Sequence, residues 1–244
     1  MKERVIYEVL RVIDGKPLFL ESHLARMKNS FKLINEEFSL KSEDICAKIN
    51  MLIKSENKNV GNIKITYKVN EKKLDVFFID HFYPTEDMYE NGVKTILYFG
   101  ERENPNAKIV NDDFRSKVNK EIKENNAFEA ILIDRNGFIT EGSKSNIFMV
   151  KGNKLLTSET KAVLPGVTRG EIIELAEKCG IEVEEIEYSY KDIDKLDGMF
   201  ISGTSPKVLP INAVDHIKIN PKNEIVLKIM KEYNNDVEKY IKNN

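Results

Sequence analysis

Apolar positions open the chain in two short runs separated by a turn signal. Apolar residues dominate residues 5–13 and return in residues 17–20, and Asp14-Gly15 stands between the two runs. An Asp-Gly pair between apolar runs is a strong hairpin signal, because these residues suit a tight turn. The opening segment therefore predicts a β-hairpin.

Helical spacing follows the hairpin. The residues on the apolar face of the first expected helix are Leu24, Met27, Phe31 and Ile34. Ser22 precedes this stripe and is of the type that caps a helix N-terminus. A second helix is expected from Ser42, with its own apolar stripe facing inward.

Two strands, 63–69 and 74–79, come next and are joined by a tight polar turn. The pattern then lapses into a connector over residues 82–92, which is a candidate domain boundary. Residues 1–85 are thus predicted to form a small α/β domain.

The second half is richer in strand patterns. Strands are expected at 93–99, 129–134, 138–140, 146–150, 154–157, 183–188 and 199–202. Helices are expected at 113–125 and 171–179, from Ser189, and after Pro221. The predicted fold class is α/β, with two domains of α+β type: the small domain 1–85 and a larger strand-rich domain 90–244.

Composition and charge exclude several kinds of partner. The chain has 244 residues, of which 41% are hydrophobic and 32% charged, as in an ordinary globular protein. Its formal net charge of −2 gives no general attraction to nucleic acid or to acidic membranes. No apolar run is long enough to span a bilayer and the N-terminus has no signal-peptide pattern, so a cytoplasmic protein is expected.

Cysteines and histidines show no metal-binding pattern. Cys46 and Cys179 lie far apart and are interpreted as two reduced thiols. His23, His81 and His216 are scattered and form no ligand cluster, so metal catalysis is not expected.

Lys108 is a candidate for covalent chemistry. It follows the Pro105-Asn106 turn and precedes an apolar pair and a predicted helix. A partly desolvated lysine amine loses proton affinity, so it can attack an aldehyde and later act as a general base. The alternative role for any single lysine is a solvated surface charge.

Glu141 is a candidate acid at the end of a predicted strand, followed by Gly142 and Ser143. A carboxylate in such a place can hold a pyridine nitrogen in its protonated form, which makes the ring an electron sink. Capping a turn is the alternative role.

Three segments could bind a phosphate. Gly166-Val167-Thr168 precedes a predicted helix, so backbone N–H groups and the Thr168 hydroxyl can hold an anion. Residues 202–205 (Ser-Gly-Thr-Ser) follow an apolar strand and could form a second anion nest. Arg26, one turn into the first helix, could bind a phosphate through two N–H groups. An amine, a carboxylate and an anion pocket are the groups that pyridoxal phosphate requires.

In this order the motifs resemble those of the class IV aminotransferases. These are the fold-type-IV pyridoxal-phosphate enzymes that include branched-chain and D-amino acid aminotransferases and aminodeoxychorismate lyase. The matching segments are His23-Leu-Ala-Arg26, Lys108-Ile-Val-Asn111, residues 141–148, Leu164-Pro-Gly-Val-Thr-Arg169 and residues 202–205. They span nearly the whole chain, and five motifs in one order are far more specific than any one of them.

The resemblance implies a D-amino acid aminotransferase-like fold, pyridoxal 5′-phosphate as cofactor and a homodimer. It implies that Lys108 binds the cofactor aldehyde covalently and that Glu141 pairs with the ring nitrogen, which makes these two the catalytic residues. The cofactor-binding residues that it implies are Arg26, Lys108, Glu141, Ser145, Asn146, Gly166, Val167, Thr168, Gly203 and Thr204. Candidates for contact with the substrate are Tyr7, Arg11, Lys68 and Ser205.

Two features depart from the family pattern. Family members usually carry roughly another strand pair before the segment that matches residues 7–11, so a shortened N-terminal part of the small domain is expected. Asp112 follows Asn111 where branched-chain enzymes have a tyrosine, and residues 66–69 (Thr-Tyr-Lys-Val) lack the Arg-x-His carboxylate trap of the D-amino acid enzymes. The substrate is therefore left open.

Three functions follow from these motifs. The first is amino transfer between an amino acid and a 2-oxo acid. The second keeps the cofactor but releases pyruvate, as an aminodeoxychorismate lyase does. The third is a non-catalytic protein that binds the cofactor with a defective substrate pocket.

Overall fold

The chain forms two compact units in the computed structural model, which describes residues 4–102 and 105–243. The first unit comprises Met1–Phe82, Asn106–Val110 and Asp236–Asn244, and the second comprises Tyr83–Pro105 and Asn111–Asn235. The predicted division into 1–85 and 90–244 stays a prediction. The short segment that carries Lys108 belongs to the first unit, not to the unit that surrounds it in sequence.

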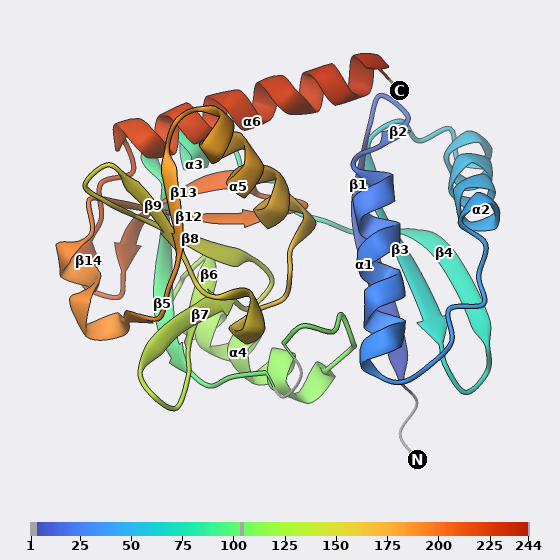
Figure 1. Cartoon of the computed structure of the whole chain (residues 1–244), viewed down its shortest axis with the longest axis horizontal. Coiled ribbons are helices and arrows are strands. Elements are labelled where there is room, and N and C mark those ends of the chain that lie inside the picture. Colours follow the sequence, from blue (N-terminus) through green and yellow to red (C-terminus); the bar gives the residue numbers. More distant parts are fainter. Residues whose placement is uncertain (1–3, 103–104, 244) are drawn as a thin grey trace. The chain divides into compact units, whose positions relative to one another are not determined.

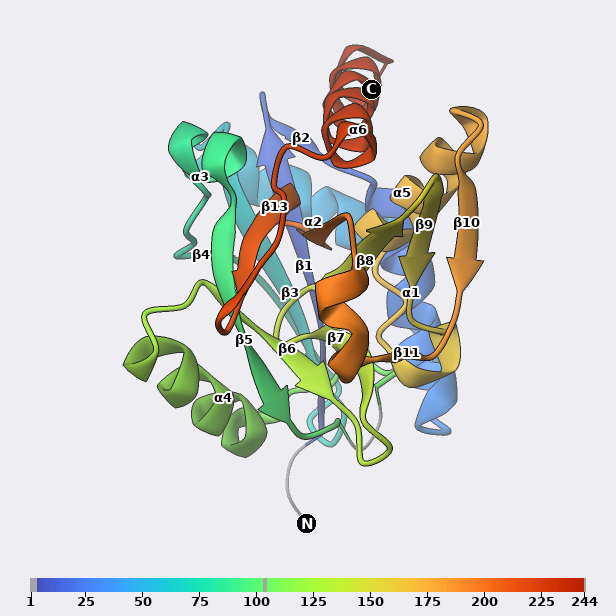
Figure 2. The ribbon, with the colours of Figure 1, turned by 90° about the vertical axis from the view of Figure 1, so that its left-hand side faces the viewer.

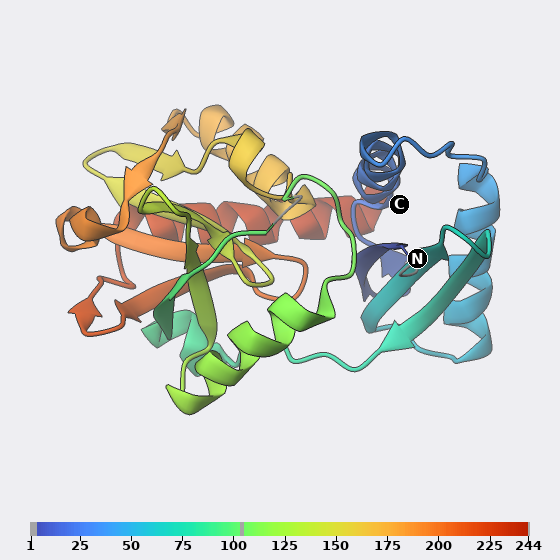
Figure 3. The ribbon, with the colours of Figure 1, turned by 90° about the horizontal axis from the view of Figure 1, so that it is seen from below.

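The first unit is a four-stranded antiparallel sheet with two helices (Figure 1). Its elements are β1 (Val5–Ile13), β2 (Lys16–Pro17), α1 (Leu20–Leu33), α2 (Ser42–Ser55), β3 (Gly61–Lys68) and β4 (Lys73–Ile79). The strand order is β2-β1-β3-β4. One face of β1 and β3 forms a core with the apolar stripes of α1 and α2, and Figure 3 shows this unit from another side.

The local sequence signals at the start of the first unit predicted its hairpin correctly but not the first residue of its first helix. The hairpin is confirmed: β1 and β2 pair antiparallel, and Asp14 and Gly15 have φ angles of 51° and 73°. The prediction of Ser22 as helix cap is wrong. Helix α1 already begins at Leu20, after Phe19 in a left-handed conformation, and no side chain caps it.

The second unit is built around a large sheet. Its strands are β5 (Val93–Phe99), β6 (Glu129–Ile133), β7 (Phe138–Gly142), β8 (Asn146–Lys151), β9 (Lys154–Thr157), β10 (Glu182–Glu185), β11 (Tyr188–Ser189), β12 (Gly198–Gly203), β13 (Lys207–Val214) and β14 (Ile217–Lys218). Its helices are α3 (Glu86–Asn91), α4 (Asp112–Glu124), η1 (Thr160–Ala162), α5 (Val167–Lys178) and η2 (Tyr190–Lys195). The last helix, α6 (Glu224–Asn243), is shared, since Asp236–Asn244 belongs to the first unit.

Six strands of this sheet close into a ring. The path β8-β12-β13-β5-β6-β7 returns to β8 because β7 pairs with β8 through Glu141 and Asn146. Apolar side chains such as Ile131, Ile147 and Ile201 form one core of this unit. Helix α4 packs through Val118 on a separate core, over β5 and β6 (Figure 2).

The mixed α/β fold class is confirmed, but several elements differ from expectation, and the expected strand 183–188 is two short strands, β10 and β11. The connector contains a helix, α3, whose N-terminus is capped by the Thr85 hydroxyl. Helix α5 begins at Val167 instead of residue 171. The strand β13 was not predicted, and it carries Pro210 paired with Phe200 of β12.

Within the described residues, no helix is both long and apolar enough to cross a membrane.

Candidate active site

The backbone of Lys108 is fixed on the edge of β1. Its carbonyl oxygen accepts a hydrogen bond from the Tyr7 N–H at 3.0 Å, and its own N–H donates to Ser30 Oγ at 3.2 Å. Ile109 bridges to Ile6 in antiparallel fashion. The segment around Lys108 thus pairs with β1 like a short extra strand. The backbone of Lys108 is positioned by Tyr7 and Ser30, which lie far from it in the sequence.

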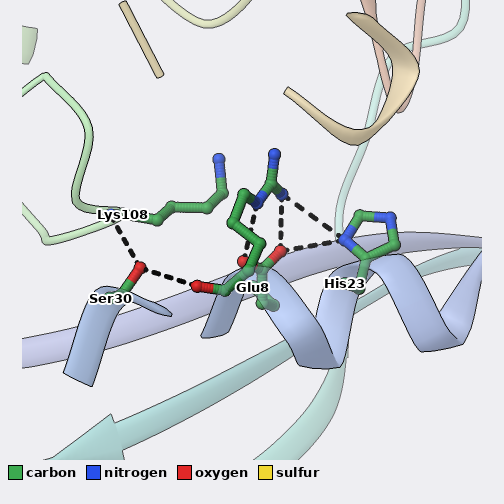
Figure 4. A network of polar contacts seen from close by, with 5 residues as sticks. Glu8, His23, Ser30 and Lys108 are labelled. Atoms are coloured by element: carbon green, nitrogen blue, oxygen red, sulfur yellow. Dashed lines mark hydrogen bonds and ion pairs between the residues drawn. The ribbon is translucent and has the colours of Figure 1, made fainter. Parts of the chain in front are cut away.

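The Lys108 side chain is half-buried and its Nζ lies 4.9 Å from the centre of the Tyr7 ring. Such a cation–π contact stabilises an ammonium group by about 0.5–1 kcal/mol at an exposed site. In Figure 4 the side chain extends from its anchor at Ser30 toward the side on which Glu8 and His23 lie.

Arg26 is buried and paired with Glu8. Arg26 Nε and Nη2 donate to Glu8 Oε1 at 2.9 Å and Oε2 at 2.6 Å, and Arg26 is only 8% exposed. His23 Nδ1 lies 2.9 Å from Glu8 Oε2 (Figure 4). Arg26 thus lies inside the first unit, against a carboxylate of β1.

The pKa values of this cluster are shifted by burial and charge. Burial by itself would raise the pKa of Glu8, but the charge and hydrogen bonds of Arg26 and His23 outweigh it and lower the pKa to about 2. Burial lowers the pKa of His23, and the nearby charges of Arg26 and Lys108 lower it further, against the opposing effect of Glu8. At neutral pH the cluster therefore contains an ionised Glu8, a charged Arg26 and a neutral His23.

The stability of the protein is expected to fall on acidification in two steps. The folded pKa of His23 lies below its ordinary 6.5, so the unfolded chain binds this proton first and stability declines as the pH falls below about 6.5. The contribution of Glu8, roughly 3 kcal/mol, is complete above pH 4.5 and is lost as the pH falls toward 2.

Urea unfolding followed by circular dichroism at pH 7.5, 5.5 and 3.5 measures both steps. His23→Gln should reduce the loss between pH 7.5 and 5.5. A midpoint that stays constant over this range would contradict the ionisation states assigned to the cluster.

Glu141 is a buried acid at the end of β7. Its Oε1 pairs with Arg102 Nη1 at 3.1 Å, and its Oε2 accepts a hydrogen bond from the Leu164 N–H at 3.0 Å. The side chain of Arg102 is 18% exposed, while that of Glu141 is 4% exposed. A cation and a backbone N–H both favour the ionised carboxylate.

A second acid, Glu129, shapes the turn after Glu141. The backbone N–H groups of Ala130, Ser143 and Lys144 and the hydroxyl groups of Ser143 and Ser145 all donate to its carboxylate. Glu129 is 5% exposed. The hydroxyl of Ser145, a predicted cofactor-binding residue, thus stabilises this turn through its hydrogen bond to Glu129.

The N-terminus of α5 has the features of an anion site. Gly166 precedes the helix and no side chain caps it. A Cβ on Gly166 would lie 2.1 Å from Asn146 Oδ1, and Asn146 Nδ2 donates to the Leu164 carbonyl at 2.9 Å. Because Asn146 and Ser202 are paired across β8 and β12, Ser202 lies beside Asn146 in the sheet.

The Ser202 hydroxyl is fully buried and has no hydrogen-bond partner within the described residues. A buried hydroxyl without a partner is costly. Together with an uncapped helix start and a buried carboxylate, it fits a ligand that carries a phosphate and a basic ring nitrogen. The residues of the second unit are therefore compatible with pyridoxal phosphate.

The remaining predicted residues are spread over both units. Thr168 and Val167 are buried in the first turn of α5, and Gly203 ends β12 immediately before Thr204 and Ser205. In the first unit Tyr7 is buried on β1, Arg11 is paired in register with Asn62, and Lys68 forms an ion pair with Glu71 at 3.2 Å. Their contacts with a cofactor or substrate remain predictions.

Sequence reasoning missed three charged residues of these clusters: Glu8, Glu129 and Arg102. Two carried a detectable signal. Glu8 stands at a core-facing position of β1, between Ile6 and Leu10, and Glu129 opens a strand that is buried throughout. An acid in a buried row must have a partner, so both could have been singled out.

Comparison with known proteins agrees with this fold and these motifs. The family described as amino-transferase class IV matches residues 5–214 of the chain. D-alanine aminotransferase of Bacillus licheniformis is 27% identical over 223 residues, which are 86% of this chain and 78% of that protein.

Two solved structures are similar over nearly the whole chain. The Escherichia coli branched-chain amino acid aminotransferase has a TM-score of 0.85 and 25% identity, and the match covers 95% of this chain and 84% of that one. A Legionella pneumophila protein described as a candidate 4-amino-4-deoxychorismate lyase has a TM-score of 0.87 and 21% identity, with 95% and 91% covered. The chain belongs to the class IV aminotransferase family, whose members are pyridoxal-phosphate-dependent enzymes.

Proposed function

We propose that the protein binds pyridoxal 5′-phosphate and transfers an amino group between an amino acid and a 2-oxo acid. The observation that carries the proposal is the anchoring of Lys108, whose backbone is fixed by Tyr7 and Ser30 while its amine lies over the Tyr7 ring. Membership of the class IV family supports it.

When bound, the cofactor supplies an aldehyde that accepts an amino group and a ring that takes up electrons from the substrate carbon. Lys108 would be the residue that binds the cofactor aldehyde, and with a substrate bound its amine would move a proton between the substrate Cα and the cofactor.

Residues of the second unit hold the ring and the phosphate in this proposal. Glu141 keeps the ring nitrogen protonated, and Leu164 N–H and Arg102 hold its carboxylate in place. Thr168, Thr204 and the N–H groups at the start of α5 bind the phosphate, and Arg26, a residue of the first unit, is proposed as a further phosphate ligand.

The proposed covalent bond is tested by identifying the lysine to which the cofactor is attached. Purified protein incubated with pyridoxal 5′-phosphate should turn yellow, and borohydride should fix the cofactor on one lysine, which peptide mass spectrometry identifies as Lys108. Fixation on another lysine, or colourless protein that does not take up the cofactor, would refute the proposal.

An aminodeoxychorismate lyase is the second candidate, because the structural likeness to the Legionella protein extends over nearly the whole chain. The two reactions differ in product. Panels of amino acids with 2-oxo acids should show amino-group exchange in the first case, and aminodeoxychorismate should yield pyruvate in the second. Exchange without pyruvate release excludes the lyase.

The resemblance also leads us to propose a homodimer located in the cytoplasm. Sedimentation of the cofactor-loaded protein tests the dimer, since a monomer at working concentrations would exclude it.

A further inference from the structure

We propose that Glu8 is a positioning residue for the cofactor phosphate: it fixes the guanidinium of Arg26 so that Arg26 can bind this phosphate. The inference rests on the proposed function and assigns a role to a residue outside the five motifs. It is carried by the buried cluster of Glu8, Arg26 and His23, of which Figure 4 labels Glu8 and His23.

Glu8 occupies a position where a charge is expensive. Along β1, Ile6, Glu8 and Leu10 are all fully buried, and Ile6 and Leu10 belong to the apolar core of the first unit. An apolar residue would fit the same row without any partner. Retaining a carboxylate there costs desolvation energy, so it calls for a reason beyond filling space.

The pairing determines the orientation of Arg26. Glu8 accepts from Nε and from Nη2, so both oxygens hold one edge of the planar guanidinium. A planar group held at two points can no longer rotate about its long axis. The proposal assigns the phosphate to the adjacent edge, formed by Nη1 and Nη2.

Glu8 is itself held from a second side. His23 Nδ1 lies 2.9 Å from the same oxygen that accepts from Arg26 Nη2. Because His23 is neutral at pH 7, it adds a hydrogen bond without adding charge. The neighbouring helix turn connects this cluster to Lys108, since the Ser30 hydroxyl donates to the Arg26 carbonyl at 3.1 Å and accepts the Lys108 N–H.

A purely structural role for Glu8 makes a different prediction. If Glu8 only neutralised a buried arginine, its alteration would weaken the binding of every form of the cofactor alike. A positioning role acts on the phosphate alone. The discriminating quantity is therefore the preference for pyridoxal 5′-phosphate over pyridoxal, which has the same aldehyde and ring but no phosphate.

The test uses Glu8→Asp, which keeps the charge and shortens the side chain by one methylene group. Equilibrium dialysis of the full-length protein with pyridoxal 5′-phosphate and with pyridoxal gives the two dissociation constants. We expect the preference to fall roughly tenfold, because a misplaced guanidinium meets the phosphate poorly. An unchanged preference in a folded variant would overturn the proposal.

A matched control and a second background sharpen the result. Arg4 and Glu36 form an ion pair of the same chemistry at an exposed place in the first unit, so Glu36→Asp should leave the preference unchanged. In an Arg26→Lys background, Glu8→Asp should have no further effect on the preference, because the edge-on pairing is already lost. A full effect in that background would show that Glu8 does not act through Arg26.

If Glu8→Asp does not fold, His23→Gln is the variant to measure instead. It removes the Nδ1 contact to Glu8 and keeps the carboxylate, so it should lower the preference in the same sense; no change would count against the proposal. The proposed function and the role of Glu8 are refuted by different results. If the wild-type protein binds neither pyridoxal 5′-phosphate nor pyridoxal, the proposed function is refuted. If the wild-type protein binds the cofactor and the variants keep the same preference, only the role of Glu8 is refuted.

Discussion

Replacing Lys108 by alanine is expected to lower amino transfer by at least about 10³-fold and to leave the protein folded. The two hydrogen bonds that anchor Lys108 come from its backbone, and alanine retains both. The cation–π contact of its side chain with the Tyr7 ring contributes about 0.5–1 kcal/mol to stability. The chemistry loses both the covalent attachment of the cofactor and the general base.

Lys64 offers a matched control, because its Nζ lies 5.2 Å from the centre of the same Tyr7 ring. Lys64→Ala removes an equivalent contact and should retain most of the activity. Rates of amino-group exchange and thermal unfolding of the three proteins give the comparison. Ordinary activity in Lys108→Ala would show that another group performs the chemistry.

Replacing Glu141 by glutamine should preserve cofactor binding and reduce turnover by about 10²- to 10³-fold, as does the loss of one electrostatic contact in other active sites. Glutamine has the same shape and can still accept the Leu164 N–H. It has no negative charge, however, so it does not stabilise a protonated ring nitrogen. Arg102 loses its ion-pair partner but is partly exposed, which limits the cost to folding.

The control for this variant is Glu129→Gln. Glu129 is a buried acid on the neighbouring strand, and it holds the same turn through hydrogen bonds to Ser143 and Ser145. This variant should lower the unfolding temperature more than Glu141→Gln does, and its turnover below that temperature should fall much less. Equal losses of turnover would mean that Glu141 matters for the shape of the turn and not for its charge.

Local chemistry made much of the fold predictable. The Asp14-Gly15 hairpin was correct because the turn depends on two residues and their φ angles. The start of α5 was placed too late, at residue 171, because Gly166 precedes the helix without a capping side chain that would fix its first residue. Strand β13 was missed because Pro210 argues against a central strand, and only its neighbours β12 and β5 make it one.

The sequence by itself determined the family of this protein, since five motifs in one order match the pattern of the class IV aminotransferases. Only the tertiary structure decided which charges are buried together. Glu8 meets Arg26 across the strand–helix packing of the first unit, and Lys108 rests on Ser30, 78 positions earlier in the chain. The physical reason is that a buried charge is stabilised by whatever packs against it, and packing partners are chosen by the folded chain and not by spacing along it.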